Sequence, residues 1–443
     1  MSDEIRLIDK IRAETIGYGG YSLSNNPFPE TGKAPQHPNF CAGRGVPLNR
    51  IYDFVADVYN HESISGLVVL GTIGGGKTHI LRYVRDKIND ELEDAPSGKA
   101  LAIYVENPQT GVLHIYSEFM SGIETALLTS VLWKVVSAAL YKEIREKKLA
   151  SDQLGPEPGT IQKWFGGELT ASGLLNVTGN LETLRDQIAR GNLSRDKLSN
   201  LFITYLEPHI SDKDFVKCSV KLLLEDDVFL LNESWNFICG LRIGKDAQKT
   251  LGLLKSSLAP RDINRSIFKS VTDIFKEAGY RVIFLLLDEV ETFATFGPQT
   301  RFAILDEFRS FFDALPSNFG LILACAPRAW QQIISTYPAL RDRIKHVVEL
   351  GYMKPEETVE LVKAYIGSAR TKGIPDPIYP FTKDAIFEIS RLRRGIVRYT
   401  VEACHTLIKE GARKSFPPIN KKFVTTYIKP LEPTEPKGAT LIE

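Results

Sequence analysis

The sequence predicts an α/β fold, in which helices cover both faces of a buried parallel sheet. Short apolar runs of strand length recur along the chain, and apolar residues at helical spacing lie between them. The runs are almost continuously apolar, which is typical of parallel strands buried on both faces. A composition of 43% hydrophobic and 25% charged residues is that of a globular chain with two or three domains. The five expected strands are 67–70, 100–105, 282–287, 320–326 and 347–350.

The first apolar run leads into a glycine-rich turn and then into a helix. Residues 71–78 read Gly-Thr-Ile-Gly-Gly-Gly-Lys-Thr, which matches G-x-x-x-x-G-K-[ST], the phosphate loop of nucleoside triphosphatases. Glycines let backbone N–H groups surround phosphate oxygens, and the helix that follows favours negative charge at its N-terminus. A plain strand-to-helix turn is disfavoured because Ile80, Leu81, Val84 and Ile88 follow at helical spacing.

This motif predicts a site for ATP and Mg²⁺. Lys77 is expected to contact the β- and γ-phosphates, and the hydroxyl of Thr78 to bind Mg²⁺. A GTPase is disfavoured because the chain lacks N-K-x-D after the loop, and an ABC ATPase because it lacks L-S-G-G-Q. The predicted nucleotide-binding residues are Gly71, Gly74, Gly75, Gly76, Lys77, Thr78 and His79.

The segments before the phosphate loop are expected to be helical. Ile5, Ile8 and Ile11 predict a short amphipathic helix in an N-terminal arm, residues 1–25, which either packs on the body or reaches a neighbouring subunit. Residues 47–60 carry apolar side chains on one face and predict a second helix. The first part of the core is expected to span 26–109.

The run 282–287 delivers two acidic residues at its C-terminal end. Ligands of open α/β sheets bind at that end of the strands. Asp288 is therefore expected to hold Mg²⁺, and Glu289 to act as the general base on the attacking water. The alternative is a strand that ends in a solvated acidic turn, which is less consistent with a phosphate loop upstream.

Residues 110–262 are expected to form a helical insertion in the core, whose second part spans 263–351. Apolar periodicity marks helices near 119–149, 181–188, 215–224 and 264–278, and residues 155–159 mark a loop. The charge runs of the insertion are either solvated faces or a contact with DNA or a protein. A helical lid is expected over 352–412, with helices at 355–366, 382–392 and 395–408. Its proline content predicts an extended tail for 413–443.

Composition excludes several other classes. With a net charge of +1, the chain as a whole has no excess of positive charge that would attract nucleic acid, which leaves only a local basic patch for such a contact. Five scattered cysteines without a C-x-x-C pair argue against disulfides and a zinc site and fit a reducing cytoplasm. The acidic N-terminus does not resemble a signal peptide, and we expect no membrane-spanning run. The expected location is cytoplasmic.

The order of these parts resembles the AAA+ ATPases over 26–109 and 264–412. Within them the chain is most similar to the Orc/Cdc6-like initiator clade. The segment from Glu277 to Glu291, which follows the insertion, is also similar to the ATP-binding proteins of BREX-type phage-defence systems. The resemblance implies an AAA+ P-loop core with sheet order 5-1-4-3-2, a large helical insertion and a C-terminal lid.

The resemblance also implies roles for individual residues. Arg343 stands where an arginine finger would act on the ATP of a neighbouring subunit, with Arg341 as second choice and a surface ion pair as the alternative. Arg398, in Gly395-Ile396-Val397-Arg398, matches the sensor 2 position, and its alternative is a surface or capping arginine. Asn26–Phe28 and Gly43–Arg44 would contact adenine or ribose, or else form a packing turn and a paired arginine.

Two departures from this family matter. Its sensor 1 strand usually ends in a polar residue that orients water, whereas here Cys325 stands there, followed by Pro327 and Arg328. Either Cys325 or Arg328 substitutes, or hydrolysis is slow. The segment after 412 is also too short for a winged-helix domain, so DNA would be contacted by the insertion, the interior of a ring, or a partner.

Two functions are therefore expected. The first is an ATPase that hydrolyses ATP at subunit interfaces of a homo-oligomeric ring or filament, working on DNA or a DNA-bound protein in replication, transposition or phage defence. The second is a slow ATP-dependent switch that controls assembly with protein partners and has no direct role on DNA. A helicase is disfavoured because the part after Asp288–Glu291 is mostly helical lid and leaves no second motor domain.

Overall fold

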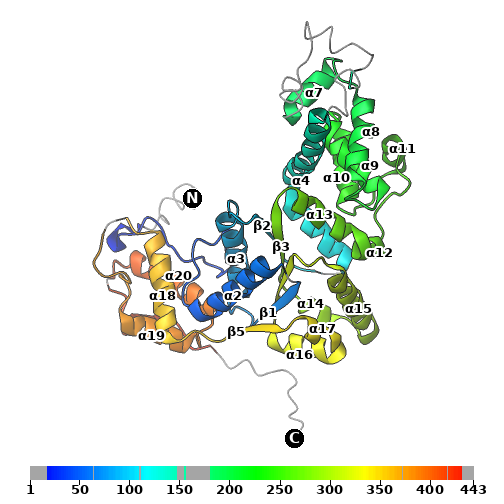
Figure 1. Cartoon of the computed structure of the whole chain (residues 1–443). Coiled ribbons are helices and arrows are strands. Elements are labelled where there is room, and N and C mark those ends of the chain that lie inside the picture. Colours follow the sequence, from blue (N-terminus) through cyan, green and yellow to red (C-terminus); the bar gives the residue numbers. More distant parts are fainter. Residues whose placement is uncertain are drawn as a thin grey trace, which may run out of the picture.

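A five-stranded parallel sheet forms the centre of the protein (Figure 1). The computed structural model describes residues 17–62, 64–108, 111–146, 154–155, 180–371, 373–416 and 418–431. The strand order is β5-β1-β4-β3-β2, and every neighbouring pair is parallel, so the predicted order is confirmed. The strands are β1 (Ser65–Gly71), β2 (Lys99–Val105), β3 (Tyr280–Leu287), β4 (Phe319–Cys325) and β5 (His346–Leu350).

Side chains of the strands alternate between two hydrophobic clusters, because successive residues of a strand point to opposite faces. Leu67 and Val69 of β1 pack with helices α2 (Gly45–His61) and α3 (Lys77–Glu91). Val68 and Leu70 join the larger cluster on the other face, which includes α13 (Phe268–Glu277) and α15 (Pro298–Ala314). Burial on both faces explains why the strands read as continuous apolar runs.

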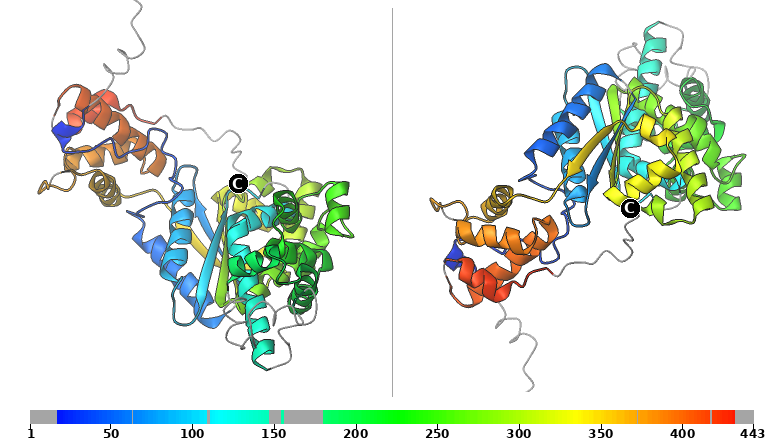
Figure 2. Two further views of the ribbon diagram at one scale, coloured as in Figure 1. Left: turned by 90° about the horizontal axis from the view of Figure 1, so that it is seen from above. Right: turned by 90° about the horizontal axis from the view of Figure 1, so that it is seen from below.

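Helix α4 (Val112–Arg145) connects the sheet to the insertion and bends at Glu124, whose φ is 63°. Before the bend it packs on the sheet and on α13. The ring centroid of Phe119 lies 4.8 Å from that of Phe268, the first residue of α13. Beyond the bend it packs with the helices of the insertion, which lie on the side away from the lid (Figure 2). These helices are α7 (Leu181–Ala189), α8 (Arg195–Leu206), α9 (Lys213–Leu224), α10 (Val228–Ile238) and α11 (Lys245–Leu251). Of the loop predicted at 155–159, residues 156–159 lie outside the described residues.

Helix α4 is also long and apolar enough to cross a membrane, by length and composition alone. The sequence predicted a helix near 119–149 but no run of membrane-spanning length. Its apolar residues are instead part of the core: Phe119, Leu128, Leu132 and Val136 are fully buried. The helix therefore packs in the core along part of its length, and 39% of its most apolar window is buried.

The lid has a hydrophobic cluster of its own, formed by α18 (Pro355–Ser368), α19 (Lys383–Leu392), α20 (Val397–Arg413) and α21 (Lys421–Tyr427). Helix α21 corrects the extended tail predicted from residue 413. Its N-cap Asn420 accepts a hydrogen bond from the N–H of Phe423, and Phe423 and Val424 are buried in the lid. The prolines that flank this helix obscured it in the sequence.

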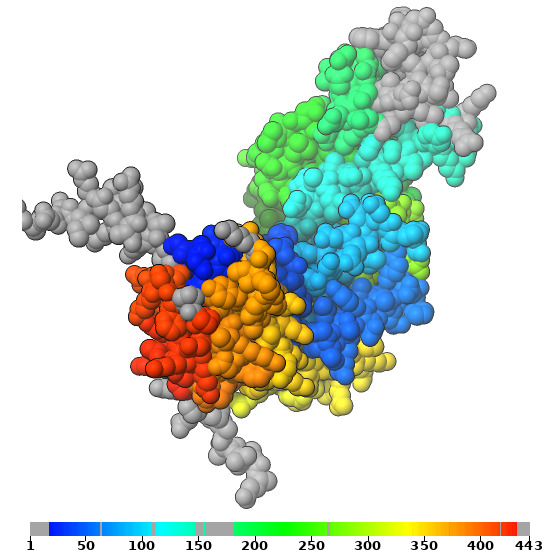
Figure 3. All heavy atoms as spheres, turned by 90° about the vertical axis from the view of Figure 1, so that its left-hand side faces the viewer, coloured from blue at the N-terminus to red at the C-terminus, as the bar shows by residue number. Residues whose placement is uncertain are grey.

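Part of the predicted N-terminal arm also belongs to the lid. Tyr21 and Leu23 of the arm are buried in the lid cluster, together with Phe28 just after it, and the Tyr21 hydroxyl donates to the carbonyl of Phe416. The space-filling view shows this segment, in dark blue, against the orange and red lid (Figure 3). The helix predicted from Ile5 to Ile11 lies outside the described residues.

The remaining elements are short or connect the strands. Strand β4 ends at Cys325, and Ala326 is the N-cap of α16 (Pro327–Thr336). Helix α17 (Ala339–Arg343) leads into β5. The helix predicted over 264–278 is observed as a π-helical turn followed by α13. The short elements are the 3₁₀ turn Gly19–Tyr21, α12 (Pro260–Asp262), the π-helix Ile263–Ile267 and α14 (Thr292–Thr295).

We predict that Gly395→Ala destabilises the protein by more than about 1 kcal/mol. Gly395 has a φ of +64°, and an added Cβ would lie 2.2 Å from the carbonyl oxygen of Met353, at the junction between β5 and the lid. Urea unfolding measures the effect. Gly367→Ala in α18, where a Cβ meets no atom within 4 Å, is the control and should be neutral or stabilising. Equal midpoints for the two variants would contradict the prediction.

Candidate nucleotide-binding site

The phosphate loop connects β1 to α3 and has the backbone that its glycines predict. Gly74 and Gly76 have φ values of +77° and +98°, in the region that disfavours residues with a Cβ. The lid touches this loop directly, since the backbone N–H of Arg398 donates to the carbonyl of Gly74 at 3.0 Å. The loop is thus held from the lid side as well as from the sheet.

Lys77, Thr78 and Asp288 come together as the sequence predicts. The Thr78 hydroxyl donates to a carboxylate oxygen of Asp288 at 2.6 Å, and the Tyr104 hydroxyl donates to the same oxygen at 2.9 Å. The Lys77 ammonium donates to the carbonyl of Gly71 at 2.9 Å and lies 3.6 Å from a carboxylate oxygen of Glu291. Both Lys77 and Asp288 are buried.

Glu289 follows Asp288 in an unusual backbone conformation. Its φ of 54° is rare for a residue with a side chain, and such conformations occur often at functional sites. Burial raises the pKa of the Glu289 carboxyl, and the charges of Asp288 and Glu291 raise it further. A raised pKa brings a carboxylate closer to the range in which general bases operate.

These groups line one pocket of about 630 Å³ between the sheet and the lid. Arg398 contributes from the lid, and Lys33 and Arg82 contribute further positive charge. The predicted residues Gly74, Gly76, Lys77, Thr78, His79, Asp288, Glu289 and Arg398 line it. Gly71 and Gly75 do not line the pocket, and their backbone carbonyls accept hydrogen bonds from Lys77 and Arg44. The arrangement can hold a phosphate chain among cations, with hard oxygen groups beside it.

A smaller pocket of about 370 Å³ adjoins the first one and shares Lys33, His79 and Tyr365 with it. Asn26, Pro27 and Phe28 line this second pocket, and Phe28 is also buried in the lid cluster. The contact of these residues with a base stays a prediction. His79 closes it by a 2.7 Å hydrogen bond to the carbonyl of Phe40, and burial lowers the pKa of this histidine.

Arg44 has a structural role, which corrects the adenine or ribose contact expected of it. Its guanidinium donates to the carbonyls of Gly75 and Gly351, at 2.9 and 2.8 Å, and only 8% of the residue is exposed. Gly43 is close-packed against Met353 and Glu357. Arg44 therefore ties the phosphate loop to the chain that leaves β5.

Arg343 lies away from the pocket of its own chain. It forms a two-pronged ion pair with Asp313 of α15 and also donates to the carbonyl of Ala339. This pair lowers the pKa of Asp313. Arg341, on the same short helix, has no ion pair within the described part of the chain and is exposed.

The end of β4 differs from what the resemblance implies. Cys325 is fully buried, burial raises the pKa of its thiol, and neither Cys325 nor Arg328 lines the pocket. Glu291 does, and its carboxylate accepts a hydrogen bond from the N–H of Ala326 at 3.2 Å. Sequence analysis missed Glu291 and Tyr104. The D-E-x-E spacing after β3 and a hydroxyl at the end of an apolar strand were the available signals.

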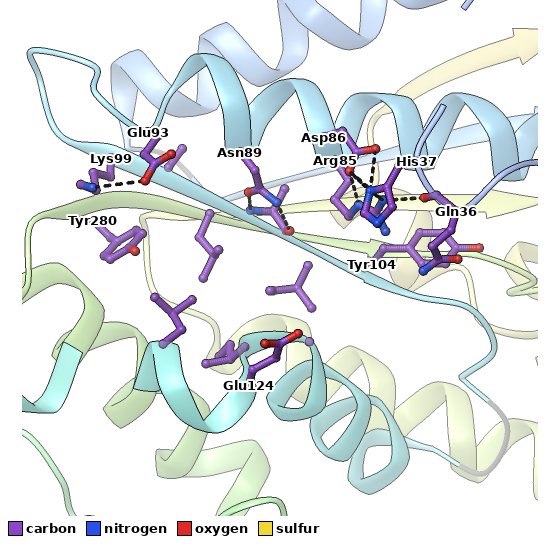
Figure 4. Close-up of a pocket in the computed structure, with 17 residues that line it drawn as sticks. Gln36, His37, Arg85, Asp86, Asn89, Glu93, Lys99, Tyr104, Glu124 and Tyr280 are labelled. Atoms are coloured by element: carbon purple, nitrogen blue, oxygen red, sulfur yellow. Dashed lines mark hydrogen bonds and ion pairs between the residues drawn. The ribbon is translucent and has the colours of Figure 1, made fainter. Parts of the chain in front are cut away.

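Another hollow, of about 560 Å³, lies at the free edge of β2 between α3 and the bend of α4 (Figure 4). Asn89 of α3 bonds both the N–H and the C=O of Ala102 there, at 2.7 and 3.0 Å. The amide thereby occupies the place that a further strand would take, which protects the sheet edge. Glu124, at the bend of α4, lines the opposite wall.

Comparisons with known proteins give partial likenesses, and no family model matches the chain. An uncharacterized HTH-type transcriptional regulator of Methanocaldococcus jannaschii, MJ0774, is 24% identical over 144 residues, 32% of this chain. The chain spans about a third of the length of that regulator (34%).

Two solved structures overlap most of the chain at low similarity. The ORC2 protein of Aeropyrum pernix, determined as ADPNP-ADP complexes, has a TM-score of 0.46 and 10% identity over 91% of this chain and 71% of its own. The Walker-type ATPase PABY2304 of Pyrococcus abyssi has a TM-score of 0.39 and 14% identity over 87% and 73%. Both overlaps are too low to carry a conclusion about activity. The fold assignment rests on the observed sheet order and loop.

We predict that Lys77→Ala weakens ATP binding at least about a hundredfold, because a buried ammonium that contacts phosphates is lost. Calorimetric titration with ATP measures the change. Lys87→Ala is the matched control, since Lys87 lies on the same helix α3 but pairs with Glu91 at the surface. Unchanged ATP affinity in a folded Lys77→Ala protein would contradict the assignment of this loop.

Proposed function

We propose that the chain is an AAA+ ATPase that hydrolyses ATP at subunit interfaces to drive assembly or remodelling on DNA or a DNA-bound partner. One observation carries the ATPase part: the phosphate loop, the acidic end of β3 and an arginine of the lid line the same pocket. The sheet order adds support, because it is the order that the resemblance to this family implies. The proposed role on DNA is supported by the lysines and arginines of the lid.

Each side chain of the pocket has a role in this proposal. Lys77 and Arg398 bind and orient the terminal phosphates. Thr78 and Asp288 fit Mg²⁺, because a hydroxyl and a carboxylate lie 2.6 Å apart and supply the hard oxygen ligands that this ion prefers. Mg²⁺, when bound, would neutralise charge on the phosphates. Glu289 accepts a proton from the attacking water, and its raised pKa suits that step.

We predict that Glu289→Gln keeps ATP affinity within about threefold and lowers turnover at least about a hundredfold. The amide is nearly isosteric with the carboxylate but cannot accept the proton. Calorimetry and phosphate release measure the two quantities. Glu106→Gln, in the same pocket, controls for the loss of one negative charge. Wild-type turnover by Glu289→Gln would remove Glu289 from the role of base.

The proposed interface uses an arginine of α17 as a finger toward a neighbouring subunit. A finger supplied in trans can raise turnover by several powers of ten. Arg343 was the first choice from the sequence, but its ion pair with Asp313 must open before it can act. Arg341 requires no such step, so both residues remain candidates.

Mixed oligomers test the finger. Arg341→Ala or Arg343→Ala subunits keep an intact pocket, whereas Lys77→Ala subunits keep an intact finger. Adding Lys77→Ala protein should therefore raise turnover about tenfold or more for whichever arginine variant lacks the finger, and not for the other arginine variant. Phosphate release at a series of mixing ratios measures this. If both arginine variants turn over ATP at the wild-type rate, α17 carries no finger.

The surface of the lid supports a contact with DNA. Residues 381–431 contain eleven lysines and arginines and four acidic residues, although the whole chain has a net charge of +1. Arg391 and Lys421, on α19 and α21, are exposed and share a single buried carboxylate, Glu388. Clustered cations of this kind bind phosphate backbones. The HTH-type designation of the partial relative points the same way.

A slow switch that controls assembly with protein partners is the alternative. The observation that favours it is the buried thiol of Cys325 at the end of β4, where a polar group would orient water. Such a switch would bind ATP tightly, turn it over slowly and be insensitive to DNA. In either case we propose a cytoplasmic homo-oligomer. The ATPase that works on DNA would act in replication, transposition or phage defence.

A further inference from the structure

Glu291 occupies a position that joins the phosphate loop to the end of β4. One carboxylate oxygen lies 3.6 Å from the ammonium of Lys77, and the other accepts the N–H of Ala326 at 3.2 Å. The backbone supports this placement, because the N–H of Val290 donates to the carbonyl of Ala324. Two hydrogen bonds thus connect the turn after β3 to the end of β4, and the Glu291 side chain is the acceptor in one of them.

The partner of Glu291 is the same ammonium that the proposed function assigns to the phosphates. Lys77 has three N–H donors, and the carbonyl of Gly71 takes one of them at 2.9 Å. At 3.6 Å the contact with Glu291 is an ion pair and too long for a strong hydrogen bond. Phosphate oxygens carry more charge and can approach Lys77 more closely, so they compete with Glu291 for it.

The segment on the other side of Glu291 leads to the proposed finger. Ala326 is the N-cap of α16, and α16 is followed by α17, which carries Arg341 and Arg343. A change at the N–H of Ala326 therefore acts on the start of α16, the helix that leads to α17 and its proposed finger. On β4 itself, the Cys325 thiol also interacts with Glu291, since burial raises the pKa of the thiol and the charge of this carboxylate and a hydrogen bond to it raise that pKa further. Cys325 is fully buried and does not line the pocket, whereas Glu291 does.

We propose that Glu291 is a positioning residue that holds Lys77 and the end of β4 together and releases them when phosphates bind Lys77. This inference rests on the proposed function, since it assumes that ATP binds at the phosphate loop. In this proposal the Glu291 carboxylate, from the turn after β3, takes the role that a polar residue at the end of β4 has in the family that the chain resembles. Phosphate binding at Lys77 would thereby change the hydrogen bonding at the start of α16, the helix that leads to α17.

Two measurements on the full chain test this proposal. The first is ATP affinity by calorimetry for Glu291→Gln and Glu291→Ala, both expected to bind ATP about three- to tenfold more tightly, because the competing charge is gone. Glu106→Gln is the matched control, since Glu106 lines the same pocket but pairs with Arg82 at 3.5 Å. Equal tightening by Glu106→Gln would show an effect of pocket charge alone and overturn the proposal.

The second measurement is hydrogen exchange of the peptide that contains Ala326 and the start of α16. In the wild type, ATP should increase exchange there at least about twofold, because Ala326 loses its acceptor. In Glu291→Ala the exchange should already be high without ATP and should not rise further. Glu291→Gln keeps an acceptor for this N–H but loses the negative charge. It therefore separates the effect of the hydrogen bond on exchange from the effect of the charge on ATP affinity.

The outcomes distinguish this inference from the proposed function. If the wild type binds ATP but exchange at Ala326 does not change, or changes equally in Glu291→Ala, the inference is wrong and the ATPase assignment stands. If the wild type binds no ATP, the proposed function fails and the inference fails with it. Thermal unfolding of each variant checks that a lost response does not come from lost folding.

Discussion

The position of β4 between β1 and β3 is the constraint on which the rest of the site depends. Parallel strands end at the same edge of a sheet, so the phosphate loop after β1 and the acidic turn after β3 meet across the end of β4. The 2.6 Å hydrogen bond from Thr78 to Asp288 is the direct result. It joins residues 210 positions apart in the chain, with the whole helical insertion between them.

The lid completes the pocket from one side and depends on both ends of the chain. The N–H of Arg398 is bonded to the phosphate loop, whereas Tyr21 and Phe28 are buried with α18 to α21. Nucleotide that bound against Arg398 would therefore act on a unit that includes the N-terminal segment. The insertion lies on the far side of the sheet from the lid, and α4 connects it to the core.

The local parts of this structure could be predicted from the sequence, and the non-local contacts could not. Five apolar runs, a glycine loop and two carboxylates have local signatures, and the family resemblance supplied the strand order that the structure confirms. The packing of Tyr21 in the lid and the pairing of Arg343 with Asp313 join distant segments and leave no pattern in the sequence. Glu291 was passed over because its role depends on where β4 ends.

The most direct test of the central claim is the molar mass of the wild-type chain, measured by light scattering with and without ATP and duplex DNA. An ATPase that works through subunit interfaces on DNA should be small without nucleotide, assemble with ATP and assemble further when DNA is added. A mass that is the same in all four conditions would contradict the shared site. Assembly with ATP that DNA leaves unchanged would instead favour the switch.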